Sequence, residues 1–153
     1  MQAVQTRRPA KPALMTWITP CLTVRDVSES IDYYERTFGF EKGETMSGPD
    51  GSLVFGQLKY EGSVVVMLGR QGAPSCKSKS PASSNVDCPI GLYVYCENVD
   101  DLYRRAEQAG ATVISEPADM FWGDRTATFE DLDGYRWTFS TNVADFDPSK
   151  APK

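Results

Sequence analysis

The sequence predicts an α+β fold built from two tandem βαβββ modules. The two halves of the 153-residue chain resemble each other, since each has an extended apolar stretch, a capped helix that stops at a glycine, and strands separated by turn signals. The expected helix caps, Asp26 and Asn98, are 72 positions apart, and the glycines Gly39 and Gly110 are 71 apart. Such repetition indicates a duplicated structural unit.

The composition bounds the possible functions. Apolar residues make up 41% of the chain and charged residues 24%, as in ordinary globular domains. The net charge of −5 argues against a nucleic-acid partner, because phosphate contacts need clustered Lys and Arg. No apolar run is long enough to span a bilayer, so we expect no membrane partner. The four cysteines form no C-x-x-C pair, and a reducing cytoplasm is the default localisation.

The chain is expected to contain one domain between two tails. A stretch rich in Ser, Pro, Gly and Lys divides this domain, and a loop of that length is usually a linker or a lid. The expected divisions are a disordered N-terminal tail at 1–15, a domain at 16–143, and a C-terminal tail at 144–153. Within the domain they are module one at 16–69, the linker or lid loop at 70–89, and module two at 90–143.

Each module begins with an extended stretch that leads into a helix. In the first, Asp26 is a suitable N-cap with Glu29 three residues later, and in the second Asn98 is followed by Asp101. Apolar side chains at helical spacing follow each cap, and the terminal glycine of each helix suits the left-handed C′ position. The two apolar stripes are Val27, Ile31, Tyr34 and Phe38, and Val99, Leu102, Ala106 and Ala109.

Three strands are expected after each helix. In the first half they are separated by Pro49-Asp50-Gly51 and Glu61-Gly62, and in the second half Asp133-Gly134 makes the last hairpin. The expected ranges are 40–46, 53–60 and 63–68 in the first half, and 112–115, 125–130 and 135–141 in the second.

Three motifs carry a resemblance to a known family. They are LTVRDVSESIDYYERTFGFE at 22–41, VYCENVDDLYRRAEQAGATVISEP at 94–117, and FWGDRTATFEDLDGYRWTFST at 121–141. The chain resembles the vicinal oxygen chelate superfamily, which includes glyoxalase I, extradiol dioxygenases and the bleomycin-resistance proteins. The third motif is the most specific and resembles the antibiotic-resistance-like branch. The resemblance covers about 17–142 and implies curled mixed sheets around a cleft, and a homodimer.

The resemblance also implies where metal-using members hold a divalent ion. Those positions lie on the first and last strands of each module, and here they fall on Thr19, Gly91, Thr138, and either Val66 or Met67. The chain contains no histidine, and none of these residues is a carboxylate. Neutral side chains of this kind are poor ligands for such ions. We therefore expect no metal and no cofactor, and metal-dependent glyoxalase or dioxygenase activity is not carried over.

Strand alternation predicts which side chains share the cleft face with those positions. The face is aromatic with a few polar groups, the usual composition of a small-molecule site. The candidate ligand-binding residues are Trp17, Thr19, Met67, Gly91, Tyr93, Tyr95, Trp122, Arg136 and Thr138. The alternative is that these aromatic residues fill the concave sheet or a dimer interface.

Trp122 precedes Gly123 in an expected turn, so it is either a rim residue that stacks on a ligand or part of a structural turn. Arg125 is expected to pair with Glu130 or Asp133. Three carboxylates lie near this region at turns or strand ends, where solvated carboxylates are the norm: Asp124, Glu130 and Asp131.

The favoured function is metal-independent binding of a small, partly aromatic molecule, such as an antibiotic or a toxic metabolite that is sequestered. The first alternative is a metal-independent isomerase or lyase that uses Tyr93, Tyr95 or a carboxylate. The second is a vestigial cleft with a structural or interaction role. No catalytic residue stands out, and whether the protein is an enzyme stays open.

Overall fold

The computed structural model of the protein describes residues 7–153 and confirms the α+β fold with two repeated modules. The first module contains β1 (Cys21–Val24), α1 (Val27–Phe38), β2 (Glu41–Ser47), β3 (Leu53–Tyr60) and β4 (Ser63–Arg70). The second contains β5 (Gly91–Tyr95), α3 (Val99–Gln108), β6 (Thr112–Asp119), β7 (Asp124–Glu130) and β8 (Arg136–Asn142).

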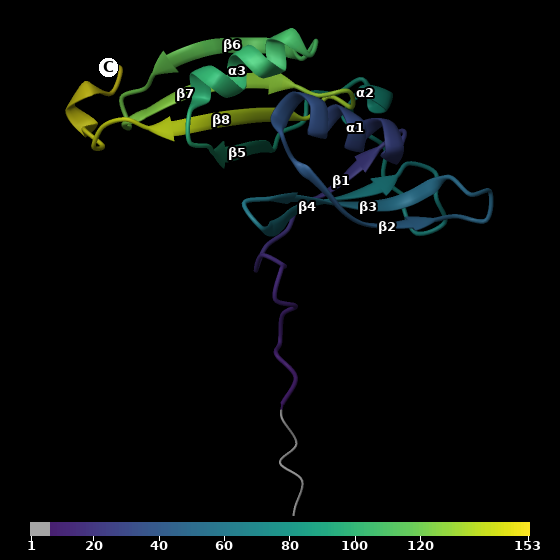
Figure 1. The fold of residues 1–153 in the computed structure, drawn as a ribbon. Coiled ribbons are helices and arrows are strands. Elements are labelled where there is room, and N and C mark those ends of the chain that lie inside the picture. Colours follow the sequence, from purple (N-terminus) through teal and green to yellow (C-terminus); the bar gives the residue numbers. More distant parts are fainter. Residues whose placement is uncertain (1–6) are drawn as a thin grey trace, which may run out of the picture.

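Each module forms its own four-stranded mixed sheet (Figure 1). The strand orders are β1-β4-β3-β2 and β5-β8-β7-β6, which are the same order in the two repeats. The first strand of each module pairs parallel with the last, and the remaining pairs are antiparallel. Parallel strands need a crossover connection, and here it consists of the helix, α1 or α3, and the two strands that follow it.

The helix ends lie where the cap residues predict them. Asp26 accepts a hydrogen bond from the backbone N–H of Glu29, and Asn98 accepts one from Asp101, so each helix starts with a side-chain cap. Gly39 ends α1 with φ +72°, and Gly110 follows α3 with φ +89°. Both glycines occupy the left-handed region, which is costly for residues that carry a Cβ.

The first strand begins later than the sequence pattern indicates. Trp17 and Thr19 precede β1, which starts at Cys21. Pro20 lies at this boundary, and a proline has no N–H to donate to the ladder. Its carbonyl still accepts from the N–H of Met67, so the segment before β1 stays beside β4.

The tails and the central loop contain structure beyond the sequence-based expectation. Residues 1–6 lie outside the described residues, but Leu14 accepts a backbone hydrogen bond from Val64 at the start of β4. The loop at 70–89 contains a short helix, α2 (Pro81–Ser84), which begins with Ser80 as N-cap and proline in the first turn. The C-terminal segment contains a 3₁₀ turn, η1 (Pro148–Lys150).

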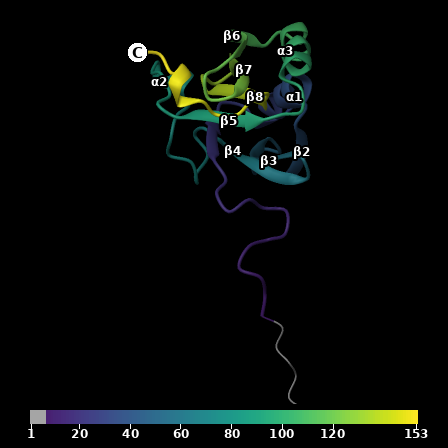
Figure 2. The same ribbon diagram turned by 90° about the vertical axis from the view of Figure 1, so that its left-hand side faces the viewer.

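The core lies between the modules. Helix α1 lies between the two sheets and packs against α3, as Figures 1 and 2 show. Tyr34 of α1 meets Trp137 of β8 with ring centroids 5.4 Å apart, and Phe38 meets Phe139 at 4.7 Å. Full burial of one large apolar side chain contributes about 1.5–3 kcal/mol, so this aromatic cluster is a main source of inter-module stability.

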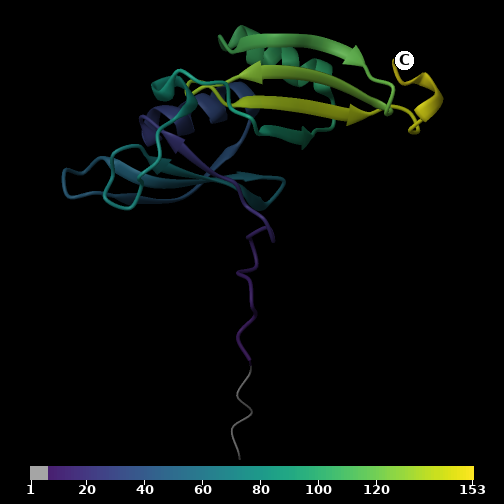
Figure 3. The same cartoon turned by 180° about the vertical axis from the view of Figure 1, so that it is seen from behind.

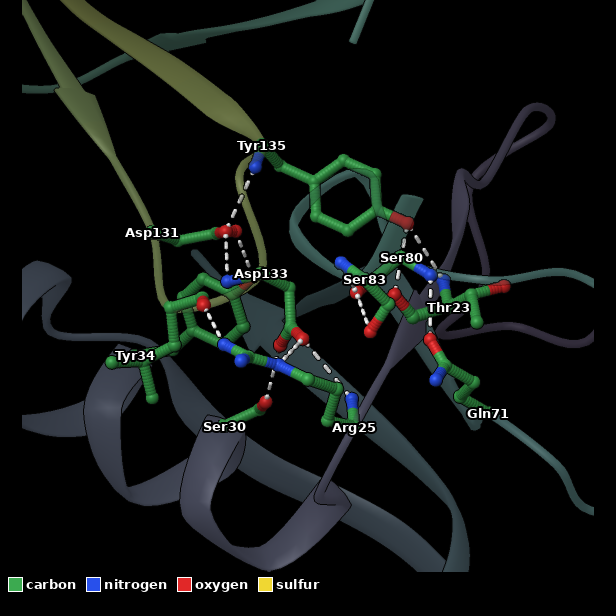
Figure 4. A network of polar contacts seen from close by, with 11 residues as sticks. Thr23, Arg25, Ser30, Tyr34, Gln71, Ser80, Ser83, Asp131, Asp133 and Tyr135 are labelled. Atoms are coloured by element: carbon green, nitrogen blue, oxygen red, sulfur yellow. Dashed lines mark hydrogen bonds and ion pairs between the residues drawn. The ribbon is translucent and has the colours of Figure 1, made fainter. Parts of the chain in front are cut away.

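A buried polar network joins the β7–β8 hairpin to α1 (Figure 4). Tyr34 donates its hydroxyl hydrogen bond to Asp131, and Trp137 donates its indole N–H to the same carboxylate at 2.9 Å. Asp133 accepts from the backbone N–H of Arg25 at 3.1 Å and from its guanidinium Nε at 3.0 Å. The hairpin is therefore fixed to the first module by side chains as well as by packing.

Asp131 is buried, and the expectation that it is a solvated carboxylate is wrong. Burial raises the pKa of Asp131, although hydrogen bonds from Tyr34, Trp137 and two backbone amides oppose that shift. The turn brings the carboxylate inward because its Oδ1 caps the backbone N–H groups of Asp133 and Tyr135.

This inward packing leaves one face of the second sheet without a helix. The residues of β8 that contact α1, Trp137 and Phe139, alternate with Arg136, Thr138 and Ser140. The latter set points to the opposite side, which Figure 3 shows in front of the helices.

We predict that Gly39→Val and Gly110→Val each lower the free energy of unfolding by at least about 1 kcal/mol. A β-branched residue at positive φ is strained, and at Gly39 a Cβ would also lie 2.8 Å from the guanidinium of Arg105. Urea denaturation measures the effect, with Gly91→Ala as the control, because Gly91 has open space and no positive φ. Wild-type stability of either valine variant would contradict the prediction.

Candidate functional site

The helix-free face of the second sheet presents two tyrosines side by side. Tyr93 and Tyr95 of β5 lie opposite Thr138 and Ser140 of β8 in the parallel register. Their side chains are 45% and 59% exposed, and their ring centroids are 5.6 Å apart in an edge-to-face arrangement. We call this surface the aromatic face; Gly91 and Arg136 extend it along the same strands.

Asp124 lies beneath the tyrosines at the start of β7. It is only 2% exposed, so the expectation of a solvated carboxylate is wrong here too. Its Oδ2 accepts from the hydroxyl of Tyr93 at 2.6 Å and from that of Tyr95 at 2.8 Å. Its Oδ1 accepts from Nδ2 of Asn142 at 3.0 Å. One carboxylate thus fixes both phenol groups while about half of each tyrosine stays exposed.

Trp122 closes one edge of the aromatic face. It lies in the turn before β7 and donates its indole N–H to the Tyr93 hydroxyl at 3.0 Å. The next residue, Gly123, has φ +97°, and a Cβ there would lie 2.2 Å from the carbonyl oxygen of Ala144. Trp122 is therefore half-buried at the rim and belongs to a tightly packed turn, and its stacking on a ligand stays a prediction.

Arg125 does not pair with Glu130 or Asp133. Its side chain points to the helix side of the sheet, where the guanidinium Nε contacts Asp100 of α3 at 3.0 Å and Nη1 contacts Asp119 at 3.1 Å. Side chains alternate between the two faces of a strand, so Arg125 and Glu130, five positions apart on β7, point to opposite faces and cannot pair. Arg125 thus anchors α3 and is not part of the aromatic face.

The hydrogen bonds set the protonation states of the site. Burial opposes ionisation of Asp124, but donors from Tyr93, Asn142, Tyr95 and Trp122 prevail and hold its pKa below the usual value. Burial and the hydrogen bond to Asp124 raise the pKa of Tyr93. The hydrogen bond to Asp124, with burial, raises the pKa of Tyr95. At neutral pH the site therefore holds a charged carboxylate and two neutral phenols.

A groove of about 340 Å³ continues from the aromatic face to the boundary between the modules. Tyr93 and Tyr95 line it together with Val65 of β4 and with Ile18, which precedes β1. This volume lies at the lower end of the range for small-molecule sites. A larger groove of about 530 Å³ runs along residues 12–15, but no aromatic side chain lines it.

The structure brings together some of the residues expected to bind a ligand and separates others. Gly91, Tyr93, Tyr95, Arg136 and Thr138 share the aromatic face, with Trp122 at its edge. Three residues belong to the first module: Trp17, Thr19 and Met67. Trp17 is 80% exposed, and the hydroxyl of Thr19 lies 2.8 Å from that of Thr16. Met67 pairs with Cys21 inside the first sheet.

The residues at the implied metal positions are likewise divided between the two modules, with Thr19, Val66 and Met67 in the first and Gly91 and Thr138 in the second. Thr138 shares a 2.9 Å hydrogen bond with Thr128, and a Cβ on Gly91 would meet no atom within 4 Å. Within residues 7–153, no group of three or more His, Cys, Asp or Glu side chains is arranged to hold a metal ion. No helix in the same range is both long and apolar enough to cross a membrane.

Sequence reasoning missed Asp124 and Asn142 as site residues. The Asp133-Gly134 hairpin pairs Glu130 with Arg136, and counting back along the two strands pairs Asp124 with Asn142. Strand alternation then places Asp124 on the same face as Thr138. The signal was present, but it depends on the hairpin register and not on a local motif.

A family model and two curated relatives match most of the chain. The family model described as Glyoxalase/Bleomycin resistance protein/Dioxygenase superfamily matches residues 15–139. An uncharacterized protein of Mycobacterium bovis is 32% identical over 127 residues, which cover 82% of this chain and 83% of that protein. An uncharacterized protein of Mycobacterium tuberculosis is also 32% identical over 127 residues, which cover 82% of this chain and 74% of that protein.

Solved structures show the same fold. The crystal structure of TioX from Micromonospora sp. ML1 superposes with a TM-score of 0.64 at 26% identity, over 82% of this chain and 98% of that one. A member of the glyoxalase/bleomycin resistance protein/dioxygenase superfamily from Sphaerobacter thermophilus gives the same TM-score at 23% identity, over 82% and 97% of the two chains.

We predict that Asp124→Asn lowers the free energy of unfolding at pH 7 by about 1–3 kcal/mol, because a neutral amide cannot accept from all the surrounding donors. The folded-state pKa of Asp124 is lowered, so its stabilising effect is complete above the usual aspartate value of about 3.9 and is lost as pH falls through the lower folded value.

Urea denaturation of both proteins at pH 7 and near pH 3 measures this difference. Asp32→Asn is the matched control, because Asp32 is exposed on α1 and its replacement removes the same charge. An equal gap between wild type and Asp124→Asn at both pH values would contradict the assignment.

Proposed function

The chain belongs to the Glyoxalase/Bleomycin resistance protein/Dioxygenase superfamily, and from this membership and the site geometry we propose that it binds a small, partly aromatic molecule without a metal. The ligand lies on the aromatic face, and its binding serves sequestration of a compound such as an antibiotic or a toxic metabolite. The observation that carries the proposal is the fixation of Tyr93 and Tyr95 by Asp124, with both rings left exposed.

Preorganisation is the physical basis for binding at this face. A ligand that stacks on Tyr93, Tyr95 or Trp122 does not have to order these rings, because hydrogen bonds already hold them. Each aromatic pair contributes about 0.5–1.5 kcal/mol beyond the area that it buries. The adjacent groove offers additional apolar surface, including Val65 and Ile18.

The same geometry favours binding over the alternatives. Tyr93 and Tyr95 donate hydrogen bonds to Asp124 and have raised pKa values, and the lowered pKa of Asp124 makes it a weak base. This arrangement is therefore poorly suited to the general base of an isomerase or a lyase. Core filling does not explain the two rings either, because the hydrophobic core lies on the opposite face of β8, around Trp137 and Phe139.

We also propose that the protein is a homodimer and that it functions in the cytoplasm. Exposed apolar side chains flank β5 and the segment before β1, and together they suit contact with a second copy. They are Trp17, Ile18 and Ile90, which leave Tyr93 and Tyr95 free for the ligand. All four cysteines are free thiols, in keeping with a reducing compartment.

The ligand is sought by a thermal-shift screen against antibiotics and aromatic metabolites, since a molecule that binds only the folded state raises the melting temperature. For a ligand found in this way, we predict that Trp122→Ala weakens binding about tenfold, or about 1.4 kcal/mol. Stability should fall by only about 0.5–1.5 kcal/mol, the usual contribution of one hydrogen bond, because Trp122 lies at the rim and donates to the Tyr93 hydroxyl.

Gly91→Leu should abolish binding of the same ligand while the fold survives. The new side chain would enter open space beside Tyr93 and obstruct the aromatic face. Isothermal titration calorimetry reads the affinity, and urea denaturation reads the stability. A Gly91→Leu protein that binds as tightly as wild type would place the ligand elsewhere.

The dimer proposal predicts a mass of about twice the 16.9 kDa of one chain by light scattering after size exclusion. Ile18→Glu should shift the protein toward monomers, because Ile18 is 87% exposed and a charge would be buried at the contact. Met46→Glu is the control, since Met46 is an exposed apolar residue on the outer strand of the first sheet. A monomeric wild-type protein at micromolar concentration would refute the dimer.

A further inference from the structure

Among residues 7–153, no cationic side chain forms an ion pair with Asp124. The residue is 2% exposed, and the hydrogen bonds to its carboxylate come from the neutral groups of Tyr93, Tyr95 and Asn142. A buried carboxylate without a countercharge is unusual, because loss of hydration disfavours an isolated ion.

The nearest arginines do not compensate this charge. Arg125 follows Asp124 in sequence but points to the helix side, where it is paired with Asp100 and Asp119. Arg136 shares the aromatic face, but it lies six residues before Asn142 along β8, which is roughly 20 Å at the rise of a strand. The negative potential of Asp124 therefore reaches the solvent through the two tyrosines.

The groups above Asp124 are suited to a cation. The faces of tyrosine and tryptophan rings carry negative potential, and they attract a positive charge within about 6 Å of the ring centroid. The phenol hydroxyls of Tyr93 and Tyr95 point their hydrogens at the carboxylate, so their positive ends are turned away from a bound ligand. A cation above the rings meets electron-rich surfaces and a buried anion beneath them.

We propose that the aromatic face selects organic cations, such as a quaternary or protonated amine attached to a flat apolar group, with the positive charge held over Tyr93 and Tyr95 and countered by Asp124. This inference rests on the proposed binding function and specifies the class of ligand. Asp124 is the specificity-determining residue, and Trp122 provides the third aromatic surface.

The experiment uses two probes of the same shape that differ in charge. One is (4-hydroxyphenyl)trimethylammonium, and the other is 4-tert-butylphenol, in which carbon replaces the charged nitrogen. Calorimetric titration of the full-length protein at neutral pH should give at least about tenfold tighter binding of the cation. Asp124→Asn should reduce this preference to less than about threefold, while Asp32→Asn, which removes the same net charge far from the site, should leave it unchanged.

A second variant tests the inference independently of how well Asp124→Asn folds. Asn142 is exposed at the end of β8, and its Nδ2 lies 3.0 Å from Oδ1 of Asp124. Asn142→Lys keeps Asp124 and places a positive charge beside it. The cation preference should be lost in this variant, because the carboxylate then has a countercharge.

The outcomes separate this inference from the proposed function. Equal affinity for both probes, or a preference that survives in Asn142→Lys, overturns cation selection. Binding of neither probe at millimolar concentration also overturns it. In each case, a neutral ligand from the thermal-shift screen that is lost in Gly91→Leu would still support binding at the aromatic face. Failure of both tests would remove the binding function as well.

Discussion

The packing of the β7–β8 hairpin on α1 is the constraint on which the rest of the structure depends. Asp131 and Asp133 lie in this hairpin and are buried, and side chains or amides from Tyr34 and Arg25 satisfy their oxygens. Because a buried carboxylate is costly without such partners, the hairpin has one favourable position against the helix. This position orients the second sheet with Trp137 and Phe139 toward α1 and turns its other face outward.

Two buried aspartates near the two ends of β7 have pKa values shifted in opposite directions by their surroundings. Asp131 lies deep between the modules, and burial outweighs its hydrogen bonds, so its pKa is raised. Asp124 lies under a thin aromatic layer, and its donors outweigh burial, so its pKa is lowered. The first carboxylate belongs to the scaffold. The second is charged at neutral pH, and because it is shielded from water its field at the outer face is stronger than that of a solvated carboxylate.

The sequence predicted the fold through signals that are local and repeated. Caps at Asp26 and Asn98, glycines at Gly39 and Gly110, and the Asp133-Gly134 turn each act within a few residues, so their spacing revealed the duplicated module. Family membership was likewise visible in contiguous motifs.

The site was predicted only in part, because its decisive contacts join separate strands. Tyr93, Tyr95 and Trp122 were expected to share a face, but Asp124 seemed solvated, since its burial comes from β5 and the end of β8. Trp17, Thr19 and Met67 were assigned to the same cleft from the family resemblance and from strand alternation. In the structure these three residues lie in the first module, away from the aromatic face. The two modules meet through the sheet faces that carry the helices, where the aromatic core lies.

The three tryptophans of the chain occupy three different environments, which makes the intrinsic fluorescence of this protein unusually easy to assign. Trp17 is 80% exposed in a single chain, so its emission there is red-shifted and open to dissolved quenchers, and burial of this residue in the proposed dimer would shift the emission to the blue. Trp137 is enclosed in the core beside Tyr34, and its blue-shifted emission reports whether the modules remain packed. Trp122 lies between these extremes against the Tyr93 hydroxyl, so a spectral change confined to it would mark events at the aromatic face alone.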